Sequence, residues 1–204
     1  MVASVAVAHY FERRPQVASN PGTVNLVLPD LHLRLETDRG VFSPERIDLG
    51  TRILLETVPP PPAEGDLLDL GCGYGPIALA MASRAPGARV WAVDVNERSV
   101  ELCRRNAEAN GLDNVRSLLA DEMDPGVRFA AIWSNPPIRI GKAAMHEMLA
   151  TWLGRLTPGG TAHLVVQKHL GSDSLQRWLT EQGWPATRLT SRSAYRILKV
   201  DARP

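Results

Sequence analysis

Asn135 is followed by two consecutive prolines, Pro136 and Pro137, at the end of an apolar segment that spans residues 130–134. Proline has no backbone N–H and a fixed φ angle, so the pair removes two donors and holds the chain in one path. The side-chain oxygen of Asn135 and the carbonyl oxygen of Pro136 then offer two hydrogen-bond acceptors in one place, which suits a planar amino group. A turn that only terminates a strand is the alternative interpretation.

A second group of residues runs from an apolar segment, 67–70, into three glycines at alternate positions, Gly71, Gly73 and Gly75, with Asp69 just before them. Glycine is needed where the backbone turns tightly or where a ligand lies against it. Pro76 then begins a helix, whose first N–H groups can bind a carboxylate. Nicotinamide-binding proteins use a related loop with the spacing G-x-G-x-x-G. A tight turn without a ligand is the alternative here.

Two acidic positions follow the next two apolar segments and would complete a site for a nucleoside cofactor. Asp94, at the end of segment 90–94, can accept hydrogen bonds from both hydroxyls of a ribose. Asp121, after segment 116–120, can accept a hydrogen bond from an adenine amino group. Taken singly, Asp94 is equally compatible with a helix N-cap, and Asp121 with a solvated loop residue. Their order along the chain with the glycines and Asn135 favours the ligand-binding interpretation.

These positions are expected at the carboxyl ends of the strands of a parallel sheet. Short apolar segments alternate with segments of helical periodicity, which indicates a doubly wound, Rossmann-like α/β sheet with helices on both faces. Two segments near the carboxyl terminus predict an antiparallel hairpin that completes a mostly parallel seven-stranded sheet. The predicted strands are 67–70, 90–94, 116–120, 130–134, 162–167, 187–190 and 194–200, and the predicted helices are 76–84, 97–110, 143–155 and 172–182.

The amino-terminal part departs from this alternation. Residues 23–28 and 31–37 alternate apolar and polar side chains around Pro29-Asp30, which predicts a β-hairpin. Residues 43–58 have helical periodicity that starts at Ser43-Pro44, and four prolines, 59–62, connect this helix to the first central strand. We therefore expect a small β-rich amino-terminal extension, 1–42, and one compact α/β unit, 43–204.

The composition limits the classes of function. With a formal net charge of +1 over 204 residues, binding to nucleic acid would need a local basic patch, because there is no global positive field. The two cysteines form no disulfide framework, and neither they nor the five histidines have metal-ligand spacing. The apolar start, 2–8, is too short for a membrane span and unlike a signal peptide. These features predict a cytoplasmic protein without a metal and specify no oligomeric state.

The motifs in this order resemble those of class I S-adenosylmethionine-dependent methyltransferases that modify exocyclic amines. The chain is more similar still to single-domain relatives of the small-subunit ribosomal RNA guanine-N2 methyltransferase family. The resemblance implies S-adenosylmethionine as the cofactor, and ribosomal RNA or the small ribosomal subunit as the partner. The stretches that carry the closer resemblance are 9–11 (HYF), 37–43 (TDRGVFS), 47–51 (IDLGT), 135–142 (NPPIRIGK) and 194–199 (AYRILK).

The resemblance also implies roles for individual residues. The catalytic groups, which would bind the reacting amine, are Asn135 and Pro136. The cofactor would contact Asp69, Gly71, Gly73, Gly75, Asp94, Val95, Asn96, Asp121, Glu122 and Asn135, with Gly50 and Thr51 near its methionine end. The substrate would contact Phe42, Pro137, Ile138, Arg139, Lys142 and Lys168.

Two departures from the family pattern bear on the substrate. Many amine methyltransferases carry Tyr or Phe after the prolines to stack on a flipped base, whereas this chain has Ile138. Either Phe42 stacks in its place or apolar contact alone holds the base. The larger bacterial guanine enzymes also carry a second, degenerate methyltransferase-like domain, for which 204 residues leave no room. The candidate RNA-binding residues are basic and could instead be ordinary solvated charges: Arg139, Lys142, Lys168 and His169.

Three other functions are compatible with part of the sequence. A protein glutamine or a small-molecule amine would fit the same Asn-Pro-Pro site. A nicotinamide oxidoreductase is disfavoured by the glycine spacing and by the prolines. A cofactor-binding module that has lost its activity and serves in assembly is disfavoured by the intact residues 135–137. Three tryptophans in or beside helical patterns are expected to pack in the core: Trp152, Trp178 and Trp184.

Overall fold

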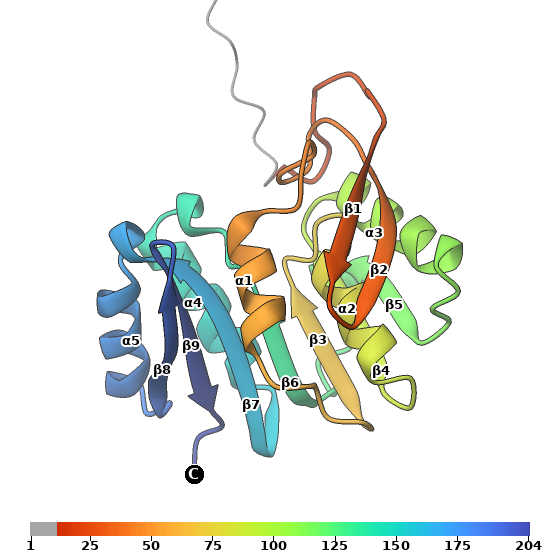
Figure 1. Cartoon of the computed structure of the whole chain (residues 1–204). Helices are drawn as coiled ribbons and strands as arrows, with labels where there is room; N and C mark the ends of the chain where they lie inside the picture. The colour runs from red at the N-terminus through yellow and green to blue at the C-terminus, as the bar shows by residue number, and fades with distance from the viewer. Residues whose placement is uncertain (1–11) are drawn as a thin grey trace, which may run out of the picture.

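The structure is a computed structural model that describes residues 12–204 (Figure 1), so the stretch 9–11 lies outside the described residues. The strands are β1 (Gly22–Leu28), β2 (Leu31–Thr37), β3 (Asp66–Leu70), β4 (Arg89–Asp94), β5 (Val115–Leu119), β6 (Phe129–Ser134), β7 (Leu156–Gln167), β8 (Ala186–Arg192) and β9 (Tyr195–Asp201). The α-helices are α1 (Leu49–Thr57), α2 (Pro76–Arg84), α3 (Glu97–Ala109), α4 (Lys142–Leu153) and α5 (Ser172–Glu181). Three short 3₁₀ helices are η1 (Ala120–Glu122), η2 (Ile138–Ile140) and η3 (Lys168–Leu170).

Seven of these strands form one sheet in the order β5-β4-β3-β6-β7-β9-β8. The five strands β3 to β7 run parallel to one another, whereas β9 runs antiparallel to both β7 and β8. The predicted doubly wound sheet with a carboxyl-terminal hairpin is thus confirmed. The chain winds outward from β3 through β4 to β5 and then returns to β6 on the other side. At such a switch of direction the carboxyl ends of the strands leave a crevice in which ligands bind.

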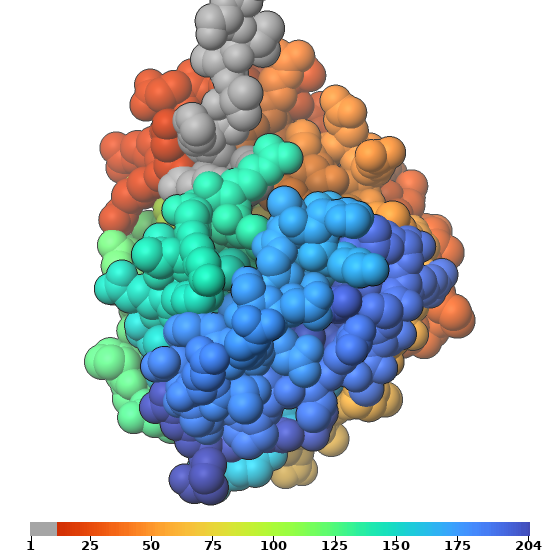
Figure 2. All heavy atoms as spheres, turned by 90° about the vertical axis from the view of Figure 1, so that its left-hand side faces the viewer, coloured from red at the N-terminus to blue at the C-terminus, as the bar shows by residue number. Residues whose placement is uncertain are grey.

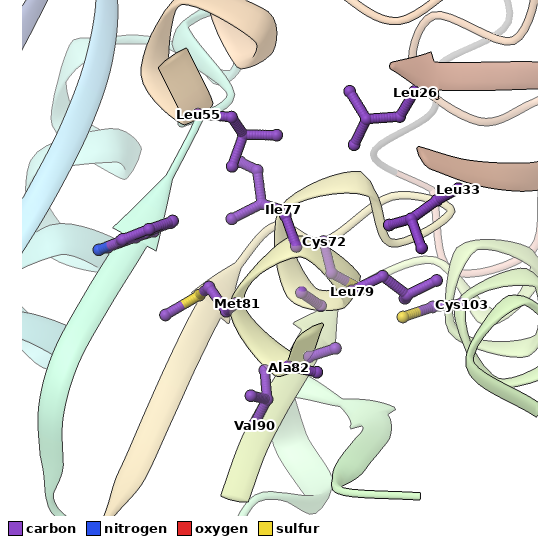
Figure 3. Packing of buried hydrophobic residues seen from close by; sticks show 14 of the residues in the cluster. Leu26, Leu33, Leu55, Cys72, Ile77, Leu79, Met81, Ala82, Val90 and Cys103 are labelled. Atoms are coloured by element: carbon purple, nitrogen blue, oxygen red, sulfur yellow. The ribbon is translucent and has the colours of Figure 1, made fainter. Parts of the chain in front are cut away.

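Helices cover both faces of the sheet (Figure 1). On one face α1, α2, α3 and the β1–β2 hairpin share a single apolar cluster, part of which Figure 3 shows, with Leu33 of the hairpin, Leu79 of α2 and Cys103 of α3. On the other face α4 and α5 pack over Phe129 and the buried Trp184. The central strands β3 and β6 are therefore buried along most of their length, as their apolar sequences predict.

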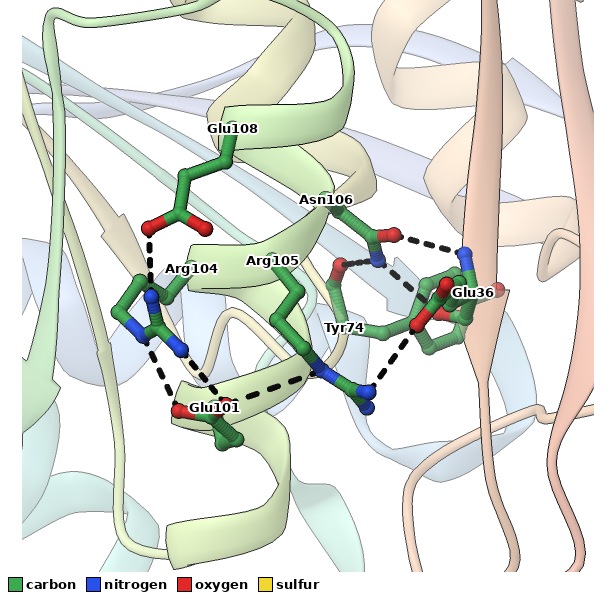
Figure 4. Close-up of polar contacts among 7 residues, drawn as sticks. All are labelled: Glu36, Tyr74, Glu101, Arg104, Arg105, Asn106 and Glu108. Carbon is green, nitrogen blue, oxygen red and sulfur yellow. Dashed lines mark hydrogen bonds and ion pairs between the residues drawn. The ribbon is translucent and has the colours of Figure 1, made fainter.

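The β1–β2 hairpin is attached to α3 and to the glycine loop by a fully buried asparagine of α3, Asn106 (Figure 4). Its side-chain N–H groups donate to the backbone carbonyls of Glu36 in β2 (2.9 Å) and Tyr74 in the glycine loop (2.8 Å). Its Oδ1 accepts from the N–H of Glu36 at 2.7 Å. Because buried polar groups need partners, this one side chain couples the hairpin, α3 and the glycine loop.

Two predicted boundaries are wrong. The helix expected from Ser43 begins at Leu49, because the Asp48 side chain accepts the Thr51 N–H and caps the helix there, whereas Ser43 has a left-handed φ of 49°. Strand β7 begins at Leu156, earlier than the predicted residue 162, because a register shift opposite β6 accommodates its Pro158-Gly159-Gly160 segment.

Candidate active site

A cavity of about 600 Å³ opens at the carboxyl ends of the central strands. Both the glycine loop and the Asn-Pro-Pro segment border it, so the structure brings the two main sequence signals together. The predicted site residues that line it are Phe42, Gly71, Gly73, Asp94, Val95, Asn135, Pro136, Pro137, Ile138 and Arg139. Further lining residues, which sequence reasoning did not assign to the site, include Asp48, Ala120, Met148, Trp152, Gln167, Leu170 and Tyr195.

The glycine loop leaves its backbone open to this cavity. Gly71 and Gly73 have positive φ angles of 77° and 55°, and a Cβ added to either would meet no atom of the described chain within 4 Å. Gly75 has a different reason to be glycine: an added Cβ would lie 2.7 Å from Cys103 Sγ and 2.8 Å from Leu79 Cδ1. The first two positions therefore let a ligand approach the backbone, and the third packs α2 against α3.

Asp69 supports the loop from inside the protein and does not border the cavity. It is fully buried, and its Oδ2 accepts the N–H of Ala78 in α2 at 2.8 Å. Its Oδ1 has no hydrogen-bond partner among the described residues. Burial raises the pKa of Asp69 to about 8, because the charged form has lost its water.

Asp94 borders the cavity between the glycine loop and α3. Its Oδ2 accepts the N–H of Gly73 (2.9 Å) and its Oδ1 accepts the N–H of Asn96 (3.0 Å). Desolvation raises its pKa above the ordinary value. The N-cap of α3 is Asn96, whose side chain accepts from Arg98 and Ser99, so Asp94 is left to face the cavity.

The other two predicted acidic residues lie outside the cavity. The carboxylate of Asp121 forms an ion pair with Arg13 at 2.8 Å, and its side chain is 64% exposed. Glu122 is also exposed, and its Oε2 accepts the N–H of Leu119 at 3.2 Å. Their neighbour Ala120 borders the cavity instead. For Asp121, the geometry is that of the solvated loop residue named as the alternative.

Asn135 is anchored through its side-chain amide. Its Nδ2 donates to Asp48 Oδ2 at 2.8 Å and to Thr51 Oγ1 at 3.1 Å. Both N–H groups of the amide are therefore used on the α1 side, and Oδ1 is the atom left for the cavity. The Pro136 carbonyl accepts the N–H of Ile138 at 2.9 Å and keeps a second lone pair.

Gly50 and Thr51 lie behind Asn135 and not in the cavity wall. Thr51 is buried and supplies the hydroxyl that contacts Asn135. A Cβ on Gly50 would lie 2.7 Å from Tyr195 Cε1 and 2.9 Å from Asp48 Oδ2, so glycine is required there for close packing. A helix-capping pattern at Asp48 was the sequence signal that could have identified this carboxylate.

The wall formed by β7 and β9 adds a polar pair that the sequence did not reveal. Gln167 and Tyr195 face each other across these strands, and Gln167 Nε2 donates to the Tyr195 hydroxyl at 2.8 Å. Most other side chains at this end are apolar, and Phe42 and Leu170 are 37% and 46% exposed at the cavity border. Lys142 and Lys168 are exposed beside this border without lining it.

The described residues offer no grouping of three or more His, Cys, Asp or Glu side chains that could bind a metal ion. Within residues 12–204, no helix combines the length and hydrophobicity that a membrane span requires.

Comparison with known proteins agrees with this geometry. The methyltransferase small domain family matches residues 32–199. An uncharacterized protein of Bacillus subtilis, YbxB, is 37% identical over 195 residues, which cover 94% of this chain and 97% of that protein. The ribosomal RNA small subunit methyltransferase C of Pseudomonas aeruginosa is 36% identical over 162 residues, which cover 72% of this chain but 48% of that enzyme.

Among solved structures, the 16S ribosomal RNA N2 guanine methyltransferase of T. thermophilus, in complex with AdoMet and guanosine, superposes with a TM-score of 0.79 at 27% identity. The superposition covers 93% of this chain and 52% of that one. The chain thus spans about half, or less, of the length of the ribosomal RNA methyltransferases that it matches.

Proposed function

Because the chain belongs to the methyltransferase small domain family, we propose that it methylates the exocyclic N2 amine of a guanine in ribosomal RNA. The chain is an S-adenosylmethionine-dependent methyltransferase with a class I fold. The observation that carries the finer proposal is the anchored amide of Asn135, which uses its NH₂ group on the α1 side and leaves Oδ1 without a role there, while Asn135 and Pro136 both border one cavity. Two neighbouring acceptors match the two N–H bonds of an exocyclic amine.

The cavity fits the cofactor. The open backbone at Gly71 and Gly73 leaves room for a ligand in direct contact, and the Asp94 carboxylate borders the same space, where it would hold the ribose hydroxyls. Val95 and Ala120 provide apolar surface beside it. When bound, S-adenosylmethionine supplies an electrophilic methyl group on a positively charged sulfur.

The protein groups would act mainly by orientation. A guanine N2 amine is a weak nucleophile because its lone pair is delocalised into the ring. Hydrogen bonds to Asn135 Oδ1 and to the Pro136 carbonyl would fix both N–H groups and direct the lone pair toward the reacting carbon. As positive charge develops on the nitrogen, its N–H groups become more acidic, and both hydrogen bonds strengthen. The apolar side chains of Ile138, Met148 and Trp152 would exclude water from this space.

An RNA substrate would approach the rim where η2, α4 and η3 meet. Figure 2 shows these segments side by side on one face of the molecule. A base that leaves its stack could lie against Phe42 and Leu170 at the cavity border. The basic side chains exposed on this rim, which would contact phosphates, are Arg139, Lys142, Lys168 and His169.

The proposal is tested by labelled methyl transfer from S-adenosylmethionine to small ribosomal subunits, naked ribosomal RNA and total protein, followed by analysis of the modified nucleosides. The expected product is N2-methylguanosine, and Asn135→Ala is expected to reduce turnover about a hundredfold, the effect of removing one oriented group. Label recovered in protein glutamine or in a small-molecule amine would contradict an RNA substrate.

A further inference from the structure

Asp48 touches both the helix α1 and the residue proposed to bind the amine. Its Oδ2 accepts the Thr51 N–H at 3.0 Å, which caps α1, and also accepts Asn135 Nδ2 at 2.8 Å. The carboxylate is half-buried and borders the cavity. One oxygen atom therefore joins the start of α1 to the segment that follows β6, across 87 positions in the sequence.

The chemistry of the partners decides which way the Asn135 amide faces. An asparagine side chain can present either its oxygen or its NH₂ group by a half-turn about its last bond. The Thr51 hydroxyl is compatible with either orientation of the Asn135 amide, because a hydroxyl both donates and accepts hydrogen bonds. The Asp48 carboxylate only accepts, so it selects the orientation with NH₂ toward α1. In the reverse orientation the amide would oppose the N–H groups of a substrate amine with its own N–H groups.

We propose that Asp48 is a positioning residue for methyl transfer: it holds the Asn135 amide so that Oδ1, and not Nδ2, faces the substrate amine. This inference rests on the proposed function of the Asn135 site. Asp48 acts through Asn135 and not by contact with the amine. Its loss therefore reduces the turnover number of the enzyme more than the affinity for either substrate.

Two variants separate this role from helix capping. Serine and asparagine are both good N-cap residues, so Asp48→Ser and Asp48→Asn should preserve α1. Asparagine can place its own side-chain oxygen where it accepts from both Thr51 and Asn135, whereas the serine oxygen lies one atom nearer the backbone. We expect kcat to fall at least about tenfold in Asp48→Ser and to stay within about threefold of the wild-type value in Asp48→Asn. Thermal unfolding of both variants tests whether the N-cap of α1, and with it the stability of the fold, is preserved.

A double-mutant cycle tests whether Asp48 acts through Asn135. In an Asn135→Ala background the substitution Asp48→Ser should lower kcat no further, because the group that it positions is gone. Additive losses would overturn the proposal, and so would an Asp48→Asn variant as inactive as Asp48→Ser. A large loss of S-adenosylmethionine affinity in Asp48→Ser would also overturn it, because Asp48 would then be a cofactor ligand.

A readout without turnover keeps this inference separate from the proposed function. The side-chain NH₂ signals of Asn135, identified by their absence in Asn135→Ala, can be followed by ¹⁵N NMR in the full chain. They should move in Asp48→Ser and return toward their original positions in Asp48→Asn. If the wild-type protein methylated no RNA, the proposed function would fail while this anchoring could still be measured. Signals unchanged in Asp48→Ser would refute the anchoring itself.

Discussion

Two carboxylates that the sequence places in one cofactor site are predicted to behave differently. Asp94 borders the cavity, so Asp94→Ala should weaken S-adenosylmethionine binding by about 1.5–3 kcal/mol, the scale of hydrogen bonds to a charged group. Asp121 lies outside it and pairs with Arg13, so Asp121→Ala should change the affinity little. Titration calorimetry compares the two. Equal losses would mean that the cofactor reaches Asp121 and that its pairing with Arg13 is displaced.

Asp69 is expected to make folding stability depend on pH. Its folded-state pKa of about 8 is raised from 3.8, so between these values the folded protein retains a proton that the unfolded chain has released. This group therefore stabilises the fold at low pH and loses that contribution as the pH rises through 8. Asp69→Asn should flatten the fall in stability between pH 5 and 8, as measured by urea unfolding. Asp113→Asn, at an exposed turn, serves as the control, and equal slopes in wild type and Asp69→Asn would contradict the assignment.

The residue scale also shows the limit of sequence reasoning. Gly71, Gly73, Asp94 and the Asn-Pro-Pro segment could be predicted because their types are required by local backbone or ligand geometry. The sequence marks Asp48 only as a possible helix cap and does not mark Tyr195, because both reach the cavity through long-range packing, with Asn135 and with Gly50.

At the scale of elements, we expect the buried side chain of Asn106 to hold the hairpin more strongly than the exposed ion pair between Arg105 and Glu36 does. Asn106→Ala would leave the N–H and carbonyl groups of Glu36 without their partners, and we expect it to lower the free energy of unfolding by about 1–3 kcal/mol. Arg105→Ala breaks only exposed ion pairs, to Glu36 and to Glu101, and should cost about 0–1 kcal/mol. Chemical denaturation compares them. A larger loss of unfolding free energy in Arg105→Ala than in Asn106→Ala would contradict this prediction.

The elements themselves could largely be predicted, and their ends less well. The alternation of apolar strands and amphipathic helices depends on local periodicity, which the sequence displays directly. The start of α1 depends on which polar residue caps it. The Asp48 side chain accepts the Thr51 N–H and also binds Asn135, whereas the Ser43 hydroxyl donates to the Arg46 carbonyl. The early start of β7 depends on pairing with β6, which no local pattern encodes.

At the scale of the whole molecule, the net charge of +1 provides no global positive field, so the proposed RNA binding would depend on the basic rim around the cavity. Charge reversal at Arg139, Lys142 or Lys168 should weaken RNA binding and reduce its salt dependence, while S-adenosylmethionine affinity stays nearly constant. Arg128→Glu is the matched control, because Arg128 directly precedes β6 at the opposite end of the parallel strands. Filter binding at several salt concentrations measures how steeply the RNA affinity of each variant falls with salt. If Arg128→Glu weakened RNA binding as much as the rim substitutions do, RNA would be held by general electrostatic attraction and not by a defined surface of the protein.

The attachment of the hairpin to α3 has a consequence for biosynthesis. Residues 22–37 leave the ribosome well before α3, because the contact between Glu36 and Asn106 spans 70 positions. A two-stranded hairpin is at best marginally stable alone in water, and the apolar cluster that buries Leu26, Leu33 and Leu35 stays incomplete until α3 has been translated. The nascent chain therefore keeps apolar side chains of the β1 and β2 segments exposed during the synthesis of β3, α2 and β4. Chaperones that bind short apolar segments would have their best target in this interval.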